Sequence, residues 1–155
     1  MKQMQIQDLI LSYPEGFHEM SREEKAGLAF YNGESGVCLS DPEAHILVTI
    51  GCKESRLAFL LQARDAAKKA EEHIRKPMQA YQYRLEEFSD HRVGGEKACG
   101  YRYRYTVQDI PMTGETVVVK HKKAFYYLNF YARTESLTDS IKKWQAMLDA
   151  AAFCG

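Results

Sequence analysis

Between residues 79 and 132, apolar and polar side chains alternate with a period of two, and this pattern constrains the fold more than any other feature. In the run YRYRY over residues 101–105, for example, tyrosines alternate with Arg102 and Arg104. On a strand, such alternation places the tyrosines on the core face of a sheet and the arginines on the opposite face. Glycine-containing turns divide the stretch into strands: Gly94-Gly95 and Thr113-Gly114. The pattern therefore predicts four strands in an antiparallel meander.

Two segments carry the spacing of amphipathic helices instead. Residues 55–76 have an apolar stripe at three- and four-residue intervals, which predicts a long helix that ends at Pro77. The stripe consists of Leu57, Leu60, Ala63, Ala67, Ala70 and Ile74. A C-terminal helix is predicted to open at Ser136, with a stripe of Leu137, Ile141, Trp144, Leu148 and Ala151. Because Trp144 belongs to this stripe, we expect it to anchor the core rather than to stack on a ligand.

The N-terminal part of the sequence is predicted to form three further strands and a short helix. The strands cover residues 6–13, 37–40 and 44–52. The helix begins with a capping box formed by Ser21 and Glu24 and extends to about Phe30. The strand over 44–52 is apolar on both faces, as is the segment AFYYLNFYA over 124–132, and such strands lie in a sheet that is covered on both sides.

These elements predict an α+β fold class. We expect a three-layer α/β/α sandwich with a central antiparallel sheet of about six to seven strands and helices on both faces. At 155 residues the chain has the usual length of one domain, so we expect a single domain over residues 1–155.

Four segments of the sequence also resemble a known family. They are SYPEGF (12–17), VGGEKACGYRYRY (93–105), GETVVV (114–119) and KKAFYYLNFYA (122–132), and an amphipathic terminal helix follows them. In these segments and in element order, the chain resembles the PsbP-like superfamily, as a distant member of bacterial type. That superfamily includes an extrinsic protein of photosystem II and a Ran-binding nuclear import factor. The resemblance implies the α/β/α fold and a non-enzymatic protein that binds another protein.

Charge and cysteine usage bear on partners and compartment. The 21 basic and 21 acidic residues cancel, so the chain as a whole has no field that would draw it to nucleic acid or to an anionic membrane, although a local patch stays possible. The first residues lack the apolar stretch of a signal peptide, and no apolar run approaches the ~20 residues that span a bilayer. The four cysteines form no CxxC pair, which favours free thiols in a reducing compartment. We therefore expect a cytoplasmic protein.

Catalytic and cofactor-binding motifs are missing from the sequence. The segment GESG over residues 33–36 is one residue short of the G-x-S-x-G nucleophile motif. The five histidines are isolated, without the spacing of metal ligands. No P-loop or GxGxxG occurs. We therefore predict that the protein is not an enzyme and has no metal or cofactor site. The leading hypothesis is a protein-interaction or chaperone-like accessory module that could form a homodimer. The alternative is a protein that binds a small molecule or an anion in a cleft between the sheet and a helix.

One group of side chains has the character of a binding site. Arg102 and Arg104 share a strand face, and Lys120 opens a basic cluster on the next hairpin, with His121, Lys122 and Lys123. If the neighbouring strands align, these cations form a stripe that could bind an acidic partner surface. The alternative is a solvated sheet edge whose lysines discourage edge-to-edge pairing. The candidate partner-binding residues are therefore Arg102, Arg104 and Lys120.

Overall fold

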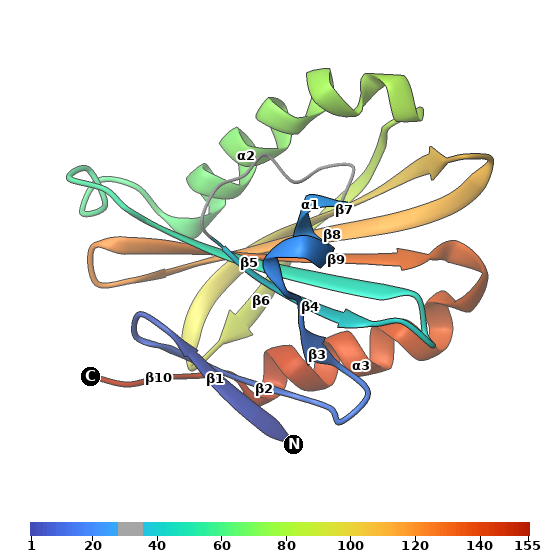
Figure 1. Cartoon of the computed structure of the whole chain (residues 1–155). Helices are drawn as coiled ribbons and strands as arrows, with labels where there is room; N and C mark the ends of the chain where they lie inside the picture. The colour runs from blue at the N-terminus through green and yellow to red at the C-terminus, as the bar shows by residue number, and fades with distance from the viewer. Residues whose placement is uncertain (28–35) are drawn as a thin grey trace.

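A seven-stranded antiparallel sheet forms the centre of the fold in the computed structural model, which describes residues 1–27 and 36–155 (Figure 1). Its strand order within the described residues is β3-β4-β5-β9-β8-β7-β6. The strands are β3 (His18–Glu19), β4 (Val37–Asp41), β5 (Ile46–Glu54), β6 (Arg84–Val93), β7 (Glu96–Val107), β8 (Ile110–His121) and β9 (Ala124–Arg133). The predicted meander is confirmed as β6 to β9, and the two strands that are apolar on both faces, β5 and β9, lie inside the sheet.

The turn between β7 and β8 differs from the sequence prediction. The chain turns at Gln108 and Asp109, both of which have positive φ, and not at Thr113-Gly114. Gly114 lies inside β8 opposite Tyr103, and a Cβ atom at this glycine would overlap the tyrosine ring. The glycine therefore marks a close approach of a side chain to the backbone, which is the other reason for a glycine inside a strand. The predicted turn at Gly94-Gly95 is confirmed, and both glycines have positive φ.

A second sheet joins the two ends of the chain. It has three strands in the described residues, in the order β1-β2-β10: β1 (Lys2–Ile6), β2 (Leu9–Tyr13) and β10 (Ala152–Phe153). The single strand predicted over residues 6–13 is thus wrong at its start, because Gln7 adopts positive φ and turns the chain. The two-residue β10 is too short to leave a periodic signal.

Three α-helices are described: α1 (Arg22–Ala26), α2 (Ala63–Met78) and α3 (Leu137–Ala150). The capping box of α1 is confirmed, since Ser21 Oγ accepts the Glu24 N–H at 3.2 Å and Glu24 Oε1 accepts the Ser21 N–H at 3.1 Å. The predicted end of this helix near Phe30 lies outside the described residues. The short 3₁₀ segments η1 (Gln79–Tyr81) and η2 (Thr134–Ser136) precede β6 and α3. No helix in the described parts of the chain is long and apolar enough to cross a membrane.

The prediction of a helix from residue 55 is wrong by two turns. Helix α2 begins at Ala63, where Asp65 accepts the N–H of Gln62 at 2.9 Å. Lys120 Nζ donates to the carbonyl oxygens of Ala58 and Leu61, both at 2.8 Å. Because a lysine from β8 occupies these carbonyls, the segment before α2 forms turns instead of a further stretch of helix.

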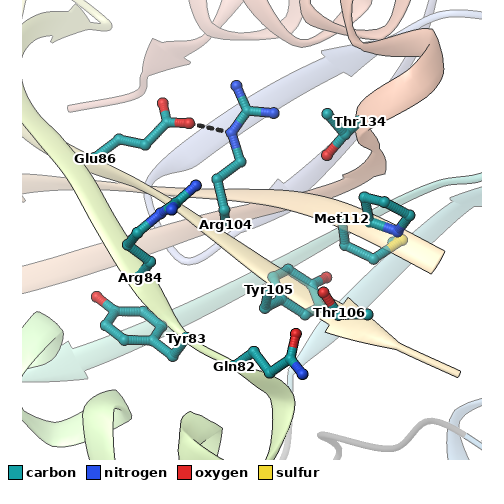
Figure 2. A pocket seen from close by; sticks show the side chains of 10 residues that line it. Gln82, Tyr83, Arg84, Glu86, Arg104, Tyr105, Thr106, Met112 and Thr134 are labelled. Carbon is teal, nitrogen blue, oxygen red and sulfur yellow. Dashed lines mark hydrogen bonds and ion pairs between the residues drawn. The ribbon is translucent and has the colours of Figure 1, made fainter. Parts of the chain in front are cut away.

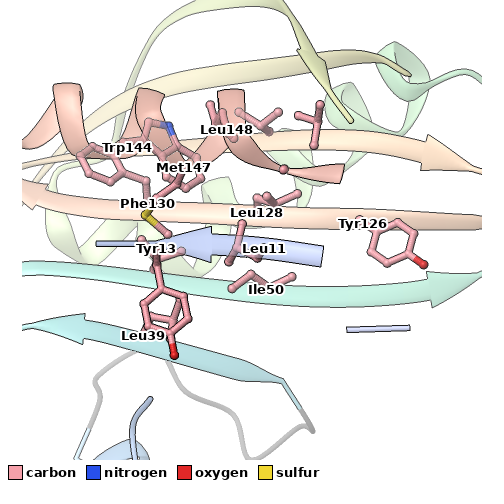
Figure 3. Packing of buried hydrophobic residues seen from close by; sticks show 14 of the residues in the cluster. Leu11, Tyr13, Leu39, Ile50, Tyr126, Leu128, Phe130, Trp144, Met147 and Leu148 are labelled. Carbon is pink, nitrogen blue, oxygen red and sulfur yellow. The ribbon is translucent and has the colours of Figure 1, made fainter. Parts of the chain in front are cut away.

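The two faces of the main sheet carry separate apolar clusters. Helix α2 packs on the face of Tyr101, Tyr103 and Tyr105, which are buried as predicted. Helix α3 packs on the opposite face, where Trp144 is buried and its ring stacks on Phe130 with centroids 5.2 Å apart (Figure 3). The core role expected for Trp144 is therefore confirmed.

The α+β class and the antiparallel sheet are confirmed, whereas the expected three-layer α/β/α sandwich is not. The three-stranded sheet lies on the same side as α3, and Leu9 and Leu11 of β2 belong to the apolar cluster that contains Trp144. A three-layer α/β/α description therefore leaves out part of the layer on that side.

Candidate functional site

The residues predicted as one cationic stripe lie on two different faces of the sheet. Register pairs Arg102 with Glu115 and Arg104 with Thr113. Lys120 lies five residues beyond Glu115 on β8, an odd number, so its side chain points to the opposite face. The structure thus brings Arg102 and Arg104 together on the α3 side, and it places Lys120 on the α2 side under the turn before α2.

Arg102 belongs to a buried polar cluster. Its Nη2 lies 3.3 Å from Glu115 Oε1, and the Glu115 side chain is only 3% exposed. The other oxygen of this carboxylate accepts the indole N–H of Trp144 at 2.7 Å. His91 Nε2 lies 3.9 Å from Glu115 Oε1 and 2.8 Å from Ser89 Oγ. Glu115 thus finds its partners within the chain, and the Arg102 guanidinium is paired with this internal carboxylate.

Arg104 lines a groove at the end of the sheet where β6 and β8 begin and β7 ends (Figure 2). The groove has a volume of about 760 Å³. We call it the arginine groove, and its lining includes Arg84, Glu86, Arg104, Tyr105, Met112 and Thr134. Arg104 forms an ion pair with Glu86, whereas Arg84 has no ion pair within the described part of the chain. The groove therefore carries two guanidinium groups and one carboxylate.

A β-bulge positions the acidic side chains beside the arginines. Register slips between Leu85 and Glu87, so that Glu87 lies opposite Arg102. The extra residue in the bulge brings Glu86 and Glu87 consecutively to the α3 side, where strict alternation would separate them. Sequence reasoning missed this arrangement because alternation alone assigns Glu87 to the other face.

Arg84 is the functional candidate that the sequence analysis did not select. It lies directly opposite Arg104 in the register of β6 and β7, and directly paired residues point to the same face. The sequence did carry one signal: Arg84 lies between Tyr83 and Leu85 in the alternating run, which places its side chain on the polar face of the strand. The register between β6 and β7, however, had to be known before these two arginines could be placed together.

The cysteines offer weak nucleophiles. Cys38, Cys52, Cys99 and Cys154 are free thiols in the structure. Burial raises the pKa of the Cys38, Cys52 and Cys99 thiols above the ordinary value, and a raised pKa leaves less of the reactive thiolate at neutral pH. Within the described ranges, no group of three or more histidine, cysteine, aspartate or glutamate side chains is placed to hold a metal ion. What the arginine groove can do chemically is to bind an anionic group through guanidinium hydrogen bonds.

The fold and the groove together define a class: an α+β protein whose large antiparallel sheet presents a charged groove at one edge. Solved structures of PsbP and Mog1p share this fold, which is the fold that the sequence resemblance predicted. The structure is similar to cyanobacterial PsbP (CyanoP) from Synechocystis sp. PCC 6803, with a TM-score of 0.72, 13% sequence identity, and coverage of 99% of this chain and 92% of that chain.

Two further structures share the fold. The Ran-binding protein Mog1p of Saccharomyces cerevisiae has a TM-score of 0.64 at 6% identity, over 98% of this chain and 94% of that chain. LpqN, involved in cell envelope biogenesis of Mycobacterium tuberculosis, has a TM-score of 0.59 at 11% identity, over 95% and 83%. No protein-family model matches the sequence, and no curated protein matches it. At these identities the likeness concerns the fold.

Proposed function

We propose that the protein is a non-catalytic accessory module that binds another protein, and that the arginine groove receives an acidic group of that partner. The observation that carries the proposal is the cross-strand pair of Arg84 and Arg104, in which Arg104 pairs with Glu86 while Arg84 has no ion pair within the described residues. Like charges directly opposite each other destabilise a strand pair. A partner carboxylate would offset this repulsion and provide the ion pair that Arg84 lacks within the described residues.

The position of the groove supports a protein partner. Strand β6 is an edge strand of the main sheet, so a partner can approach the groove without displacing another element. The fold is shared with Mog1p, whose name describes it as a Ran-binding protein. The free thiols support a reducing, cytoplasmic setting, and the neutral net charge supports a partner other than nucleic acid.

The alternative is that the groove binds a small anion or anionic metabolite without a protein partner. Its volume of about 760 Å³ falls in the range of small-molecule sites, roughly 300–1,000 Å³. The groove lies at the sheet edge and not between sheet and helix, where the sequence analysis placed the alternative. Titration with inorganic phosphate and with acetate, followed by NMR shifts at Arg84 and Arg104, tests this alternative directly.

A charge-reversed pair of variants tests the protein-binding proposal. Affinity capture from native extract with the wild-type chain should recover a partner, and the double variant Arg84→Glu with Arg104→Glu should recover much less of it. With the purified partner, the variant should associate at least tenfold more slowly at low salt, because complementary charges act mainly on the association rate. The difference should shrink as salt screens the charges.

The matched control is Lys68→Glu with Lys69→Glu, which makes the same charge change on the exposed face of α2. We expect this control to bind the partner nearly as the wild type does. If both double variants bind equally well at every salt concentration, the groove is a solvated edge and the proposal is wrong.

A further inference from the structure

A five-residue segment between β5 and α2, Leu57 to Leu61, exposes four apolar side chains at one end of the molecule. We call this segment the apolar loop, and Figure 1 shows it projecting beyond the sheet. Phe59 is 78% exposed, Leu60 65% and Leu57 55%. The sequence analysis expected Leu57 and Leu60 to be buried in a helix stripe. Instead, the loop displays a cluster of large apolar side chains to solvent, which is a feature that calls for a function.

The backbone of the apolar loop is firmly held. Ala58, in its middle, is 2% exposed and packs into the cluster beneath α2. The Ser55 N–H donates to the Lys123 carbonyl at 2.9 Å, which ties the start of the loop to the turn between β8 and β9. Lys120 Nζ holds the carbonyls of Ala58 and Leu61. The exposed side chains are therefore presented by an ordered turn and do not result from a frayed helix end.

Most backbone amides of the loop find partners inside the chain. The Leu57 N–H donates to Ser55 Oγ, and those of Ala58, Leu60 and Leu61 donate to the carbonyl oxygens of the third residue before each. A segment that enters a non-aqueous medium has to satisfy its polar backbone groups internally. The apolar loop meets most of this requirement, so burying it would cost little in lost hydrogen bonds to water.

Cations surround the base of the apolar loop. Lys53, Arg56 and Lys123 are exposed and have no ion pair within the described residues. Lys120 contributes a further positive charge, because the groups that its ammonium contacts, the carbonyl oxygens of Ala58 and Leu61, are neutral. The neighbouring Glu54 lies on the other face of the sheet from Lys53, since successive residues of a strand alternate.

Two acids on the loop side offset part of this positive charge. Asp65 accepts the Gln62 N–H at the start of α2, and Asp90 lies 3.6 Å from Arg64. The surface around the loop therefore combines an apolar tip with an excess of positive charge, although the net charge of the chain is zero.

We propose that the apolar loop inserts into the surface of a lipid bilayer that contains anionic lipids. Apolar side chains that enter the interface, next to cations that meet anionic headgroups, form the combination that binds peripheral proteins to membranes. A protein interface of standard size uses about 20–30 residues a side, far more than this five-residue tip supplies. The inference is independent of the arginine groove, and it concerns binding to the membrane surface and not a membrane-spanning segment.

Sedimentation with lipid vesicles tests the proposal. The full-length protein should bind vesicles of phosphatidylcholine with about 30% phosphatidylglycerol, whose anionic headgroups give the surface a negative potential, and should bind pure phosphatidylcholine weakly. The double variant Phe59→Ser with Leu60→Ser should lower the partition coefficient about tenfold or more, from the lost apolar burial. Because both side chains are exposed, this variant should unfold at the same temperature as the wild type.

Phe88→Ser is the matched control, since Phe88 is a partly exposed aromatic residue on the edge strand β6, outside the loop. It should bind vesicles like the wild type. Lys53→Glu with Arg56→Glu should lose binding to anionic vesicles while keeping the weak binding to neutral ones. A Phe59→Trp variant should show a blue-shifted emission on vesicle addition, which reports insertion of the loop itself.

Two outcomes would overturn the proposal. One is a wild-type protein that does not bind anionic vesicles at moderate salt. The other is a concentration-dependent dimer in sedimentation equilibrium that the Phe59→Ser and Leu60→Ser changes abolish, because the loop would then pair with a second copy of the chain.

Discussion

The indole N–H of Trp144 on α3 donates a hydrogen bond to the carboxylate of Glu115 on β8, with 2.7 Å between Nε1 and Oε2. Both side chains are almost fully buried. The contact therefore links the C-terminal helix to the centre of the sheet by a polar bond inside an apolar layer, and a carboxylate in such a place needs its partners.

Trp144 should be among the most sensitive positions for stability. Trp144→Ala should lower the free energy of unfolding by about 3–5 kcal/mol, since it removes a large buried ring. Trp144→Phe keeps most of the volume but leaves one oxygen of Glu115 without its donor, which should cost about 1–3 kcal/mol. Urea unfolding measures both values. A loss below about 0.5 kcal/mol for the alanine variant, the level of a surface change, would place this ring outside the core.

Arg102 and Arg104 should differ sharply in their contribution to stability. Arg102 pairs with the buried Glu115, whereas Arg104 pairs with Glu86, whose side chain is 29% exposed. Removing one member of a buried pair costs about 3–5 kcal/mol, and exposed pairs contribute about 0–1 kcal/mol. Because Arg102 is itself 25% exposed, we expect Arg102→Gln to lose about 2 kcal/mol, below that buried range. Arg104→Gln should lose less than about 1 kcal/mol. Thermal unfolding of the two variants side by side measures both losses of stability. Equal losses would contradict the placement of Arg102, and not Arg104, beside a buried carboxylate.

Gly114 should not tolerate a methyl group. A Cβ atom there would overlap the ring of Tyr103, which lies opposite on β7. Gly114→Ala should therefore destabilise the protein by about 1–3 kcal/mol, as overpacking does. Gly51→Ala is the control, because a Cβ atom at Gly51 would meet no atom within 4 Å. If Gly114→Ala unfolds at the wild-type urea concentration, the close approach of Tyr103 is not present.

Stability at acid pH should depend on Glu71 of α2. The Arg75 guanidinium, helped by the Tyr83 hydroxyl and opposed by burial, lowers the pKa of the Glu71 carboxyl in the folded protein. A carboxyl whose pKa is lower when folded stabilises the protein above its unfolded pKa of about 4.3, and this contribution is lost as the pH falls through the lower folded value.

The test compares Glu71→Gln with Glu72→Gln in urea unfolding between pH 3 and pH 7. The wild type should lose stability as the pH drops below about 4, near the unfolded pKa of a glutamate. Glu71→Gln should be less stable at pH 7 and should show a shallower loss in acid. Glu72→Gln should follow the wild type, and identical curves for all three proteins would exclude the proposed role of Glu71.

The thiols should stay unlinked in the protein isolated from its native cells. Mass spectrometry after alkylation without reduction should find Cys38, Cys52, Cys99 and Cys154 all modified. A native disulfide between any two of them would contradict the reducing compartment that we propose.

The sequence by itself determined the elements whose signal is local. The alternation of the YRYRY run reports burial on a strand, and the capping box of Ser21 and Glu24 closes within four residues, so neither depends on distant parts of the chain. Trp144 was assigned to the core for the same reason, from the spacing of its own helix. These features need no knowledge of which strand pairs with which.

Tertiary structure decided the rest, through contacts between residues far apart in the chain. Lys120 Nζ donates a hydrogen bond to the carbonyl oxygen of Ala58, 62 residues earlier. The segment predicted as the start of a helix therefore forms the apolar loop. Strand register puts Arg84 beside Arg104 and sends Lys120 to the opposite face, so the candidate site changed its members. A shift of one residue in pairing reverses the face of every side chain on a strand, and the sequence pattern does not contain that register.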